Sequence, residues 1–172
     1  MITRQSIPLK VLLVFLLAAC NLRKADAQSS QPSEKQILTR SLVDSQNYVF
    51  VAQSAIPMSG RARTLTSQYD LKITQHSIVS YLPYFGRSDM PPIDPTQGGI
   101  MFTSKDFDYK LTERKKGGWN IDIKPKDYRD VPRMFLTVST DGYASLQVTS
   151  NTRQSISFNG YITAPEAPKS SH

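Results

Sequence analysis

The stretch FDYKLTERKKGGWNIDIK, residues 107–124, decides the fold of this chain. Apolar and polar residues alternate along it on both sides of the pair Gly117-Gly118. Alternation with a period of two is typical of a β-strand with one face on a core, and two glycines between such runs indicate a hairpin turn. The stretch therefore predicts a β-hairpin that buries its apolar positions, which are Phe107, Tyr109, Leu111, Trp119, Ile121 and Ile123.

The same alternation continues along the chain, between turns such as Asp141-Gly142. Eight or nine short strands joined in this way predict an antiparallel meander. A meander of this length must hide its edge strands, either by closing into a barrel or by folding into two packed sheets. We favour the barrel and keep the sandwich as the alternative. The further strand-like runs are 48–55, 69–74, 78–85, 134–140, 143–150 and 156–162.

One helix is predicted before the first strand. Ser33 stands three residues ahead of Gln36, which is the spacing of a capping box. The apolar residues that follow recur at helical spacing and predict a helix to about Gln46, packed on the barrel or plugging one of its ends. The fold class is therefore mainly β, an antiparallel meander closing into a β-barrel with one N-terminal α-helix. The expected apolar stripe of the helix is Ile37, Leu38, Leu42 and Val43.

The N-terminus resembles the signal peptide of a bacterial lipoprotein. Arg4 and Lys10 flank the start of an apolar run at 11–19, which is shorter than the roughly 20 residues that span a bilayer. Residues 17–20, LAAC, match a lipobox, in which a peptidase cuts before the cysteine and the thiol carries a diacylglyceryl group. We expect Cys20 to be the lipid-attachment site, because two or more acyl chains hold a protein stably at a membrane.

A second cleavage site is the alternative. Cleavage after Ala27, at the end of the sequence ADA, would suit an ordinary signal peptidase and release a soluble secreted or periplasmic protein. Arg23 and Lys24 argue against this site, because they would place charge between the apolar run and the cut. Since residues 21–24 carry no acidic group, we expect the anchored protein on the outer membrane, facing the periplasm.

Four segments divide the chain. We predict a lipoprotein signal peptide at 1–19, the lipidated cysteine with a flexible tether at 20–32, a single barrel-like domain at 33–162 and a disordered tail at 163–172. The tether and the tail are polar and lack apolar periodicity. Cys20 is the only cysteine, so no disulfide can form within one chain and the domain depends on its core alone.

Most of the sequence motifs that are typical of common enzyme mechanisms are missing. The sequence has no G-x-S-x-G turn, no P-loop, no dinucleotide-binding glycine motif and no CxxC. His172 lies in the tail and His76 in a polar turn, so neither a histidine metal site nor a Ser-His-Asp triad is expected. We interpret Asp106 and Asp108 as outward residues of an ordinary alternating strand. We expect a protein that is not an enzyme and that has no metal and no cofactor.

The chain is basic, with a formal net charge of +7. An extracytoplasmic address disfavours nucleic acid as a partner, whereas a basic surface suits anionic lipid or polysaccharide. The densest basic cluster, Arg114-Lys115-Lys116, falls on the predicted hairpin turn, where we expect it to be solvated. Contact of this cluster with an anionic headgroup or a glycan is the alternative.

The candidate ligand-binding residues lie in YLPYFGR at 81–87 and are Tyr81, Tyr84, Phe85 and Arg87. Aromatic walls with one cation suit a barrel mouth that takes an amphipathic molecule, with Arg87 at the rim for its anionic group. Packing of these aromatics in the core is the other interpretation. The Pro- and Gly-rich stretch that follows, 88–99, is the expected lid.

Several stretches together resemble a known family. They are NYVFVAQSAIPMSGRARTLTSQYDLKIT, VSYLPYFGRS, GGIMF, the hairpin at 108–127, and LTVSTDGYASLQVTSNTRQSISFNGYI. Within them, YLPYFGR followed by NTRQSISFNGYI is fairly specific as a pair. On these residues the chain is similar to the domain of unknown function 4251 family over 33–162. The resemblance implies a β-barrel of lipocalin-like topology in a small secreted or lipid-anchored envelope protein of Gram-negative bacteria. It implies no catalytic residue.

Two functions fit these observations. The barrel could bind a small apolar or amphipathic ligand, or the domain could be a protein-interaction or assembly module of the cell envelope. The interior separates them, because a small barrel can either hold one ligand or be filled by its own side chains.

Replacing Cys20 with alanine removes the expected acylation site. We expect this variant to move from the membrane fraction to the soluble fraction, or to remain in the membrane as unprocessed precursor. Metabolic labelling with a fatty acid should tag the wild type and leave the variant untagged. A wild type that takes up no label would contradict the prediction.

Overall fold

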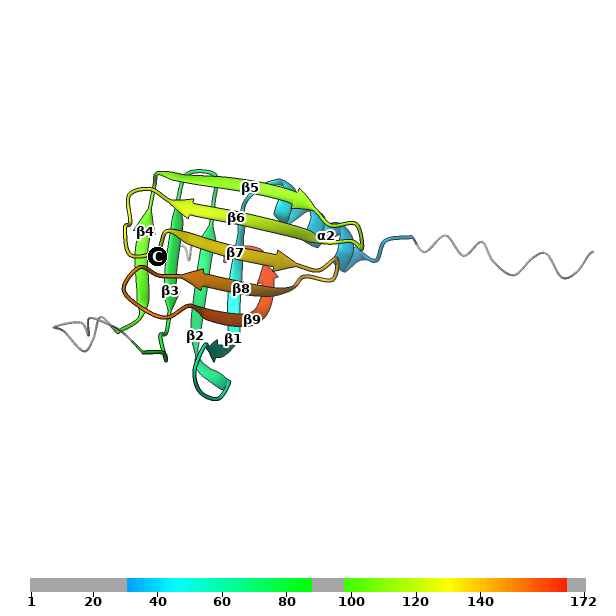
Figure 1. The fold of residues 1–172 in the computed structure, drawn as a ribbon. Helices are drawn as coiled ribbons and strands as arrows, with labels where there is room; N and C mark the ends of the chain where they lie inside the picture. Colours follow the sequence, from blue (N-terminus) through cyan, green and yellow to red (C-terminus); the bar gives the residue numbers. More distant parts are fainter. Residues whose placement is uncertain (1–30, 88–97, 167–172) are drawn as a thin grey trace, which may run out of the picture. The chain divides into compact units, whose positions relative to one another are not determined.

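The computed structural model describes residues 31–87 and 98–166, with one helix and nine strands in these ranges (Figure 1). The helix precedes all of the strands. The elements are α2 (Glu34–Asp44), β1 (Tyr48–Pro57), β2 (Arg63–Ile73), β3 (Ile78–Leu82), β4 (Ile100–Ser104), β5 (Phe107–Glu113), β6 (Trp119–Pro125), β7 (Arg133–Val138), β8 (Tyr143–Thr149) and β9 (Ile156–Thr163).

All nine strands belong to one sheet in the order β4-β3-β2-β1-β9-β8-β7-β6-β5. The first and last strands, β1 and β9, lie side by side in the middle of the sheet and pair antiparallel. The sheet curls so that β1–β4 run across β5–β9 (Figure 1). The predicted antiparallel barrel with one N-terminal helix is confirmed, although the barrel is nearly closed rather than fully closed.

The two free edges of the sheet are β4 and β5. These strands follow each other in the chain, but the turn at Lys105 and Asp106 carries the backbone from one edge to the other without pairing them. We call the gap between β4 and β5 the seam. Unpaired edges offer backbone groups to other chains, so a barrel that is not closed by pairing has to cover them by other means.

The predicted hairpin at 107–124 is present, but the expected burial is wrong for Leu111 of β5, which is 37% exposed. Tyr109 lies opposite Ile123 and Leu111 opposite Ile121. Gly117 and Gly118 have φ angles of 85° and 82°, a conformation that glycine adopts without steric cost. Trp119 is buried, as the alternation predicts.

The helix begins at the predicted capping box, in which Ser33 and Gln36 bond each other's backbone N–H. The chain leaves the helix through Gln46, which has a left-handed φ of 50°. The predicted apolar stripe is wrong in its first half, because Ile37 and Leu38 are 59% and 55% exposed. Only the later turns of α2 meet the core, where its buried residues are Thr39, Leu42 and Val43.

Side chains fill the barrel interior. The largest residues that are less than 2% exposed come from seven of the nine strands. A side chain with so little accessible surface has protein atoms on all sides, as in the close-packed cores of other domains. These residues are Tyr48, Phe50, Leu71, Ile73, Ile78, Leu82, Ile121, Ile123, Met134, Leu136, Leu146 and Phe158.

Gly160 marks the closest approach of two strands in the centre of the sheet. A Cβ atom at this position would lie 1.9 Å from the carbonyl oxygen of Val51 on β1. Because that oxygen belongs to the backbone, Gly160→Ala should separate β1 from β9 and lower the free energy of unfolding by about 3 kcal/mol or more.

Urea unfolding followed by the emission of Trp119 measures this loss. The control is Asn159→Ala at the neighbouring exposed position, which should change stability by less than about 0.5 kcal/mol. Equal stability of the two variants would show that β1 and β9 do not approach as closely as described.

Candidate functional site

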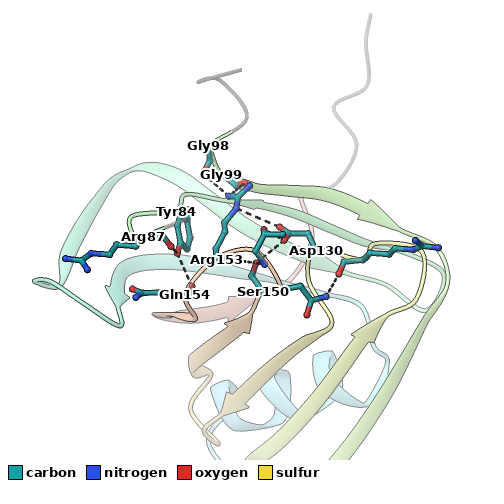
Figure 2. A network of polar contacts seen from close by, with 11 residues as sticks. Tyr84, Arg87, Gly98, Gly99, Asp130, Ser150, Arg153 and Gln154 are labelled. Atoms are coloured by element: carbon teal, nitrogen blue, oxygen red, sulfur yellow. Dashed lines mark hydrogen bonds and ion pairs between the residues drawn. The ribbon is translucent and has the colours of Figure 1, made fainter. Parts of the chain in front are cut away.

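The end of the barrel opposite α2 carries a network of polar contacts (Figure 2). Four segments meet there: the chain leaving β3, the chain entering β4, the β6–β7 loop and the β8–β9 loop. We call this network the closing cluster. Its labelled members are Tyr84, Arg87, Gly98, Gly99, Asp130, Ser150, Arg153 and Gln154.

Arg153 is the centre of the closing cluster. Its Nη1 donates to the carbonyl oxygens of Gly98 at 3.1 Å and Gly99 at 3.0 Å, directly before β4. Its Nε lies 3.8 Å from Oδ2 of Asp130, and the Arg153 side chain is only 12% exposed. A guanidinium that is mostly buried needs such partners, because a buried unpaired charge is strongly destabilising. Arg153 therefore ties the β8–β9 loop to the start of the edge strand.

Asp130 joins the β6–β7 loop to the same point. Its Oδ1 accepts hydrogen bonds from the hydroxyls of Ser150, at 3.0 Å, and Thr152. Its backbone oxygen accepts from the N–H of Asn151 at 2.9 Å. The carboxylate thus has a hydrogen-bonded side, toward the two hydroxyls, and an ionic side, toward Arg153.

Tyr84 holds the chain that leaves β3. Its hydroxyl lies 2.6 Å from the carbonyl oxygen of Arg87 and 3.1 Å from that of Gln154. The N–H of Gln154 donates to the same Arg87 oxygen at 3.2 Å, and the Arg153 guanidinium lies 5.3 Å from the centre of the Tyr84 ring. The closing cluster therefore joins the two sequence stretches that carry the most specific family resemblance.

A second set of contacts covers the seam from the β6–β7 loop. The Asp127 carboxylate accepts from the Ser104 hydroxyl and, at 2.8 Å, from the N–H of Lys105. These donors hold the pKa of Asp127 below its usual value, so the contact keeps its charge until the pH falls through that lowered pKa. Tyr128 stacks on Phe102 of β4, with ring centres 4.3 Å apart. Loop side chains thus close the barrel where the backbone does not.

The four predicted ligand residues do not share one wall. Tyr81 faces outward from β3, is 48% exposed and stacks on Tyr69 at 5.6 Å. Tyr84 belongs to the closing cluster, and half-buried Phe85 lies under the guanidinium of Arg63 at 4.9 Å. Arg87 is exposed and its side chain points away from the closing cluster (Figure 2).

One prediction about this region is wrong, and others concern residues that the structure does not describe. The strand expected at 78–85 ends at Leu82, because Pro83 follows and has no N–H for a ladder. β3 pairs with β2 on one side and with β4 on the other. Cys20 and the expected lid at 88–99, apart from its last two glycines, lie outside the described residues.

Sequence reasoning missed Asp130 and Arg153. Both lie in loops without periodic patterning, and their partners are distant in sequence. The resemblance drew attention to the stretch NTRQ, which contains Arg153, but assigned it no role. No local signal marks Asp130.

The chemistry of the closing cluster is that of a clamp. Its charged and hydroxyl groups bond one another and the backbone, although Oε1 of Gln154 is buried without a hydrogen-bond partner. His76 lies exposed on the β2–β3 turn. Within 31–87 and 98–166, no three metal-binding side chains come together. None of the helices in those ranges is long and apolar enough to cross a membrane.

The fold and the closing cluster define a class of protein: a small antiparallel β-barrel with a packed interior and a seam held by loop side chains. The chain belongs to the family described as domain of unknown function (DUF4251), whose model matches residues 30–162.

One solved structure supports this fold. It is a DUF4251 family protein from Bacteroides eggerthii, 17% identical, with a TM-score of 0.56 over 76% of this chain and 87% of that chain. At this identity the similarity shows the fold alone. No curated protein matches the chain.

Removing the charge of Arg153 should open the closing cluster. Arg153→Gln leaves Asp130 without its cation in a site where both side chains are largely shielded, so we expect a loss of about 3 kcal/mol in the free energy of unfolding. Asp130→Asn in the same chain should recover part of that loss, because the two residues act on each other. Urea unfolding of the single and double variants measures the coupling.

The matched control is Arg87→Ala, an exposed arginine on the same end of the barrel. It should change stability by less than about 0.5 kcal/mol. Additive effects of the Arg153 and Asp130 substitutions would contradict the clamp.

Proposed function

We propose that this protein is a lipid-anchored cell-envelope protein that acts as a protein-interaction module and is not an enzyme. The observation that carries the proposal is the packed interior. A carrier of a small ligand needs an internal surface that the ligand can cover, usually apolar with a few placed polar groups. Here the corresponding side chains, from Phe50 on β1 to Phe158 on β9, already cover one another.

One polar pair of the interior also supports the proposal, although Nε1 of Trp119 and Oγ of Ser139 are buried without a hydrogen-bond partner. The hydroxyls of Tyr48 and Tyr109 lie 3.1 Å apart and form a hydrogen bond. Burial raises the pKa of both phenols, so both stay protonated at neutral pH. Because these two hydroxyls are partners of each other, they do not supply the free polar group that orients a small ligand.

The outer surface carries exposed residues that suit recognition of another protein. Tyr81 on β3 lies opposite Met101 on β4, and both are exposed, by 48% and 40%. Tyr69 on β2 stacks against Tyr81 and extends this patch to a third strand. Aromatic residues, methionine and arginine are enriched at protein interfaces. The residues first expected around a ligand, Tyr81 and Arg87, therefore suit contact with a protein partner.

The envelope address rests on the N-terminal sequence. Residues 17–20 match a lipobox, and the chain between Cys20 and the helix at Glu34 is polar. An anchored domain with a packed barrel is expected to work by holding its outer surface near a partner at the same membrane.

Native mass spectrometry of the full protein, purified from its own host, tests the proposal. We expect the mass of the processed and acylated chain, alone or with a protein partner. A small amphipathic molecule bound in stoichiometric amount would overturn the proposal in favour of the carrier.

Photo-crosslinking in cells provides a second readout. A crosslinking residue at Tyr81 should yield a discrete product with another protein. The same residue at Lys124, which is exposed on β6, serves as the control and should not yield that product. Equal products from both positions would contradict recognition by this patch.

A further inference from the structure

We infer that the end of the barrel that carries α2 rests on an anionic lipid surface. The inference rests on the lipid anchor of the proposed function and adds an orientation to it. The surface, here called the helix end, consists of the exposed residues Ile37 and Leu38 of α2 and the basic β5–β6 turn, Arg114-Lys115-Lys116.

Two side-chain contacts join α2 to the turns of the helix end. Arg40 of α2 forms an ion pair with Glu113 at 3.1 Å, directly before the basic turn. Gln36 Nε2 donates to Oδ1 of Asp141 in the β7–β8 turn at 3.0 Å. In Figure 1, α2 accordingly lies beside the turns at one end of β5–β8.

The apolar part of the helix end is largely exposed. Ile37 and Leu38 are neighbours on the first half of α2, and both expose more than half of their surface. Tyr143, the first residue of β8, is 63% exposed and lies under the ammonium of Lys35 of α2 at 4.7 Å. Aliphatic and aromatic residues bordered by cations are typical of elements that lie in a membrane interface.

The basic part of the helix end is free to meet anionic headgroups. Arg114, Lys115 and Lys116 are exposed, and within the described residues none of them forms an ion pair. The adjacent Glu113 is already paired with Arg40. Each lysine or arginine close to an anionic membrane increases binding by about fivefold.

Chain length permits this end to meet the membrane that would hold the anchor. Cys20 and Ser33 are 13 positions apart, and a chain of that length spans at most about 45 Å. Arg23 and Lys24 add two basic residues within this connection. The closing cluster and Arg87 lie at the opposite end of the barrel and would then face away from the bilayer.

Hydrogen exchange on the anchored protein tests the inference. The full acylated protein is placed in nanodiscs of phosphatidylcholine, with or without phosphatidylglycerol. On the anionic discs we expect slower exchange of backbone amides in α2 and in the turn at 113–118, and unchanged exchange at 150–154.

Two sets of variants separate the contributions. Replacing Arg114, Lys115 and Lys116 by serine should remove the slowing of exchange on anionic discs. Each replacement lowers the affinity of the helix end for the anionic surface by up to about fivefold. Replacing Arg61, Lys124 and Arg129, which are exposed elsewhere, removes the same charge and should keep the slowing. Ile37→Ser with Leu38→Ser should also reduce it, while the unchanged emission of Trp119 shows that the fold is kept.

The outcomes are distinguishable. If the protein carries acyl chains but α2 exchanges alike on both discs, or if the two triple variants behave alike, the docking is refuted and the anchor remains. If the purified protein carries no acyl chain, both the anchor and the orientation built on it are refuted.

Discussion

The structure depends on how the two unpaired edges of its single nine-stranded sheet are covered. The chain order puts β4 and β5 at opposite ends of the sheet, although only a short turn separates them in sequence. No backbone ladder closes the seam, so side chains have to. Arg153 holds the entry to β4 through two carbonyl oxygens, and Asp127 holds its exit through Ser104 and Lys105. Both clamps come from loops. Ordering their side chains and removing their charges from water costs free energy, and the protection of the edge strand offsets that cost.

The same arrangement is the basis for the proposal that the protein acts through the outside of the barrel. Clamps at one end and α2 at the other enclose an interior that apolar side chains already fill. A barrel filled by its own side chains can still present a defined outer surface, and the exposed pair Tyr81 and Met101 lies on neighbouring strands of this barrel. Under the proposed function, anchoring and recognition would be tasks for different faces of one small domain.

Much of the fold could be predicted from local sequence patterns, because alternation reports which face of a strand is buried. The hairpin around Gly117-Gly118, the capping box of Ser33 and the burial of Trp119 all follow from residues close in sequence. The exposure of Ile37 and Leu38 did not follow, because helical spacing shows that a face is apolar but not what covers it. The clamp between Asp130 and Arg153 was out of reach for a related reason. It pairs two loop residues from different hairpins, and neither loop has a period that fixes its direction.

The central claim is that loop side chains, and Arg153 first among them, protect the edge strand β4. Amide hydrogen exchange of individual β4 residues in the intact protein tests it most directly, because exchange measures how often each strand opens. The account predicts that β4 is protected nearly as well as β1 in the wild type, and that Arg153→Gln makes β4 exchange fast while β1 and β9 stay protected. Fast exchange of β4 in the wild type, or exchange in Arg153→Gln that rises equally in all strands, would contradict it.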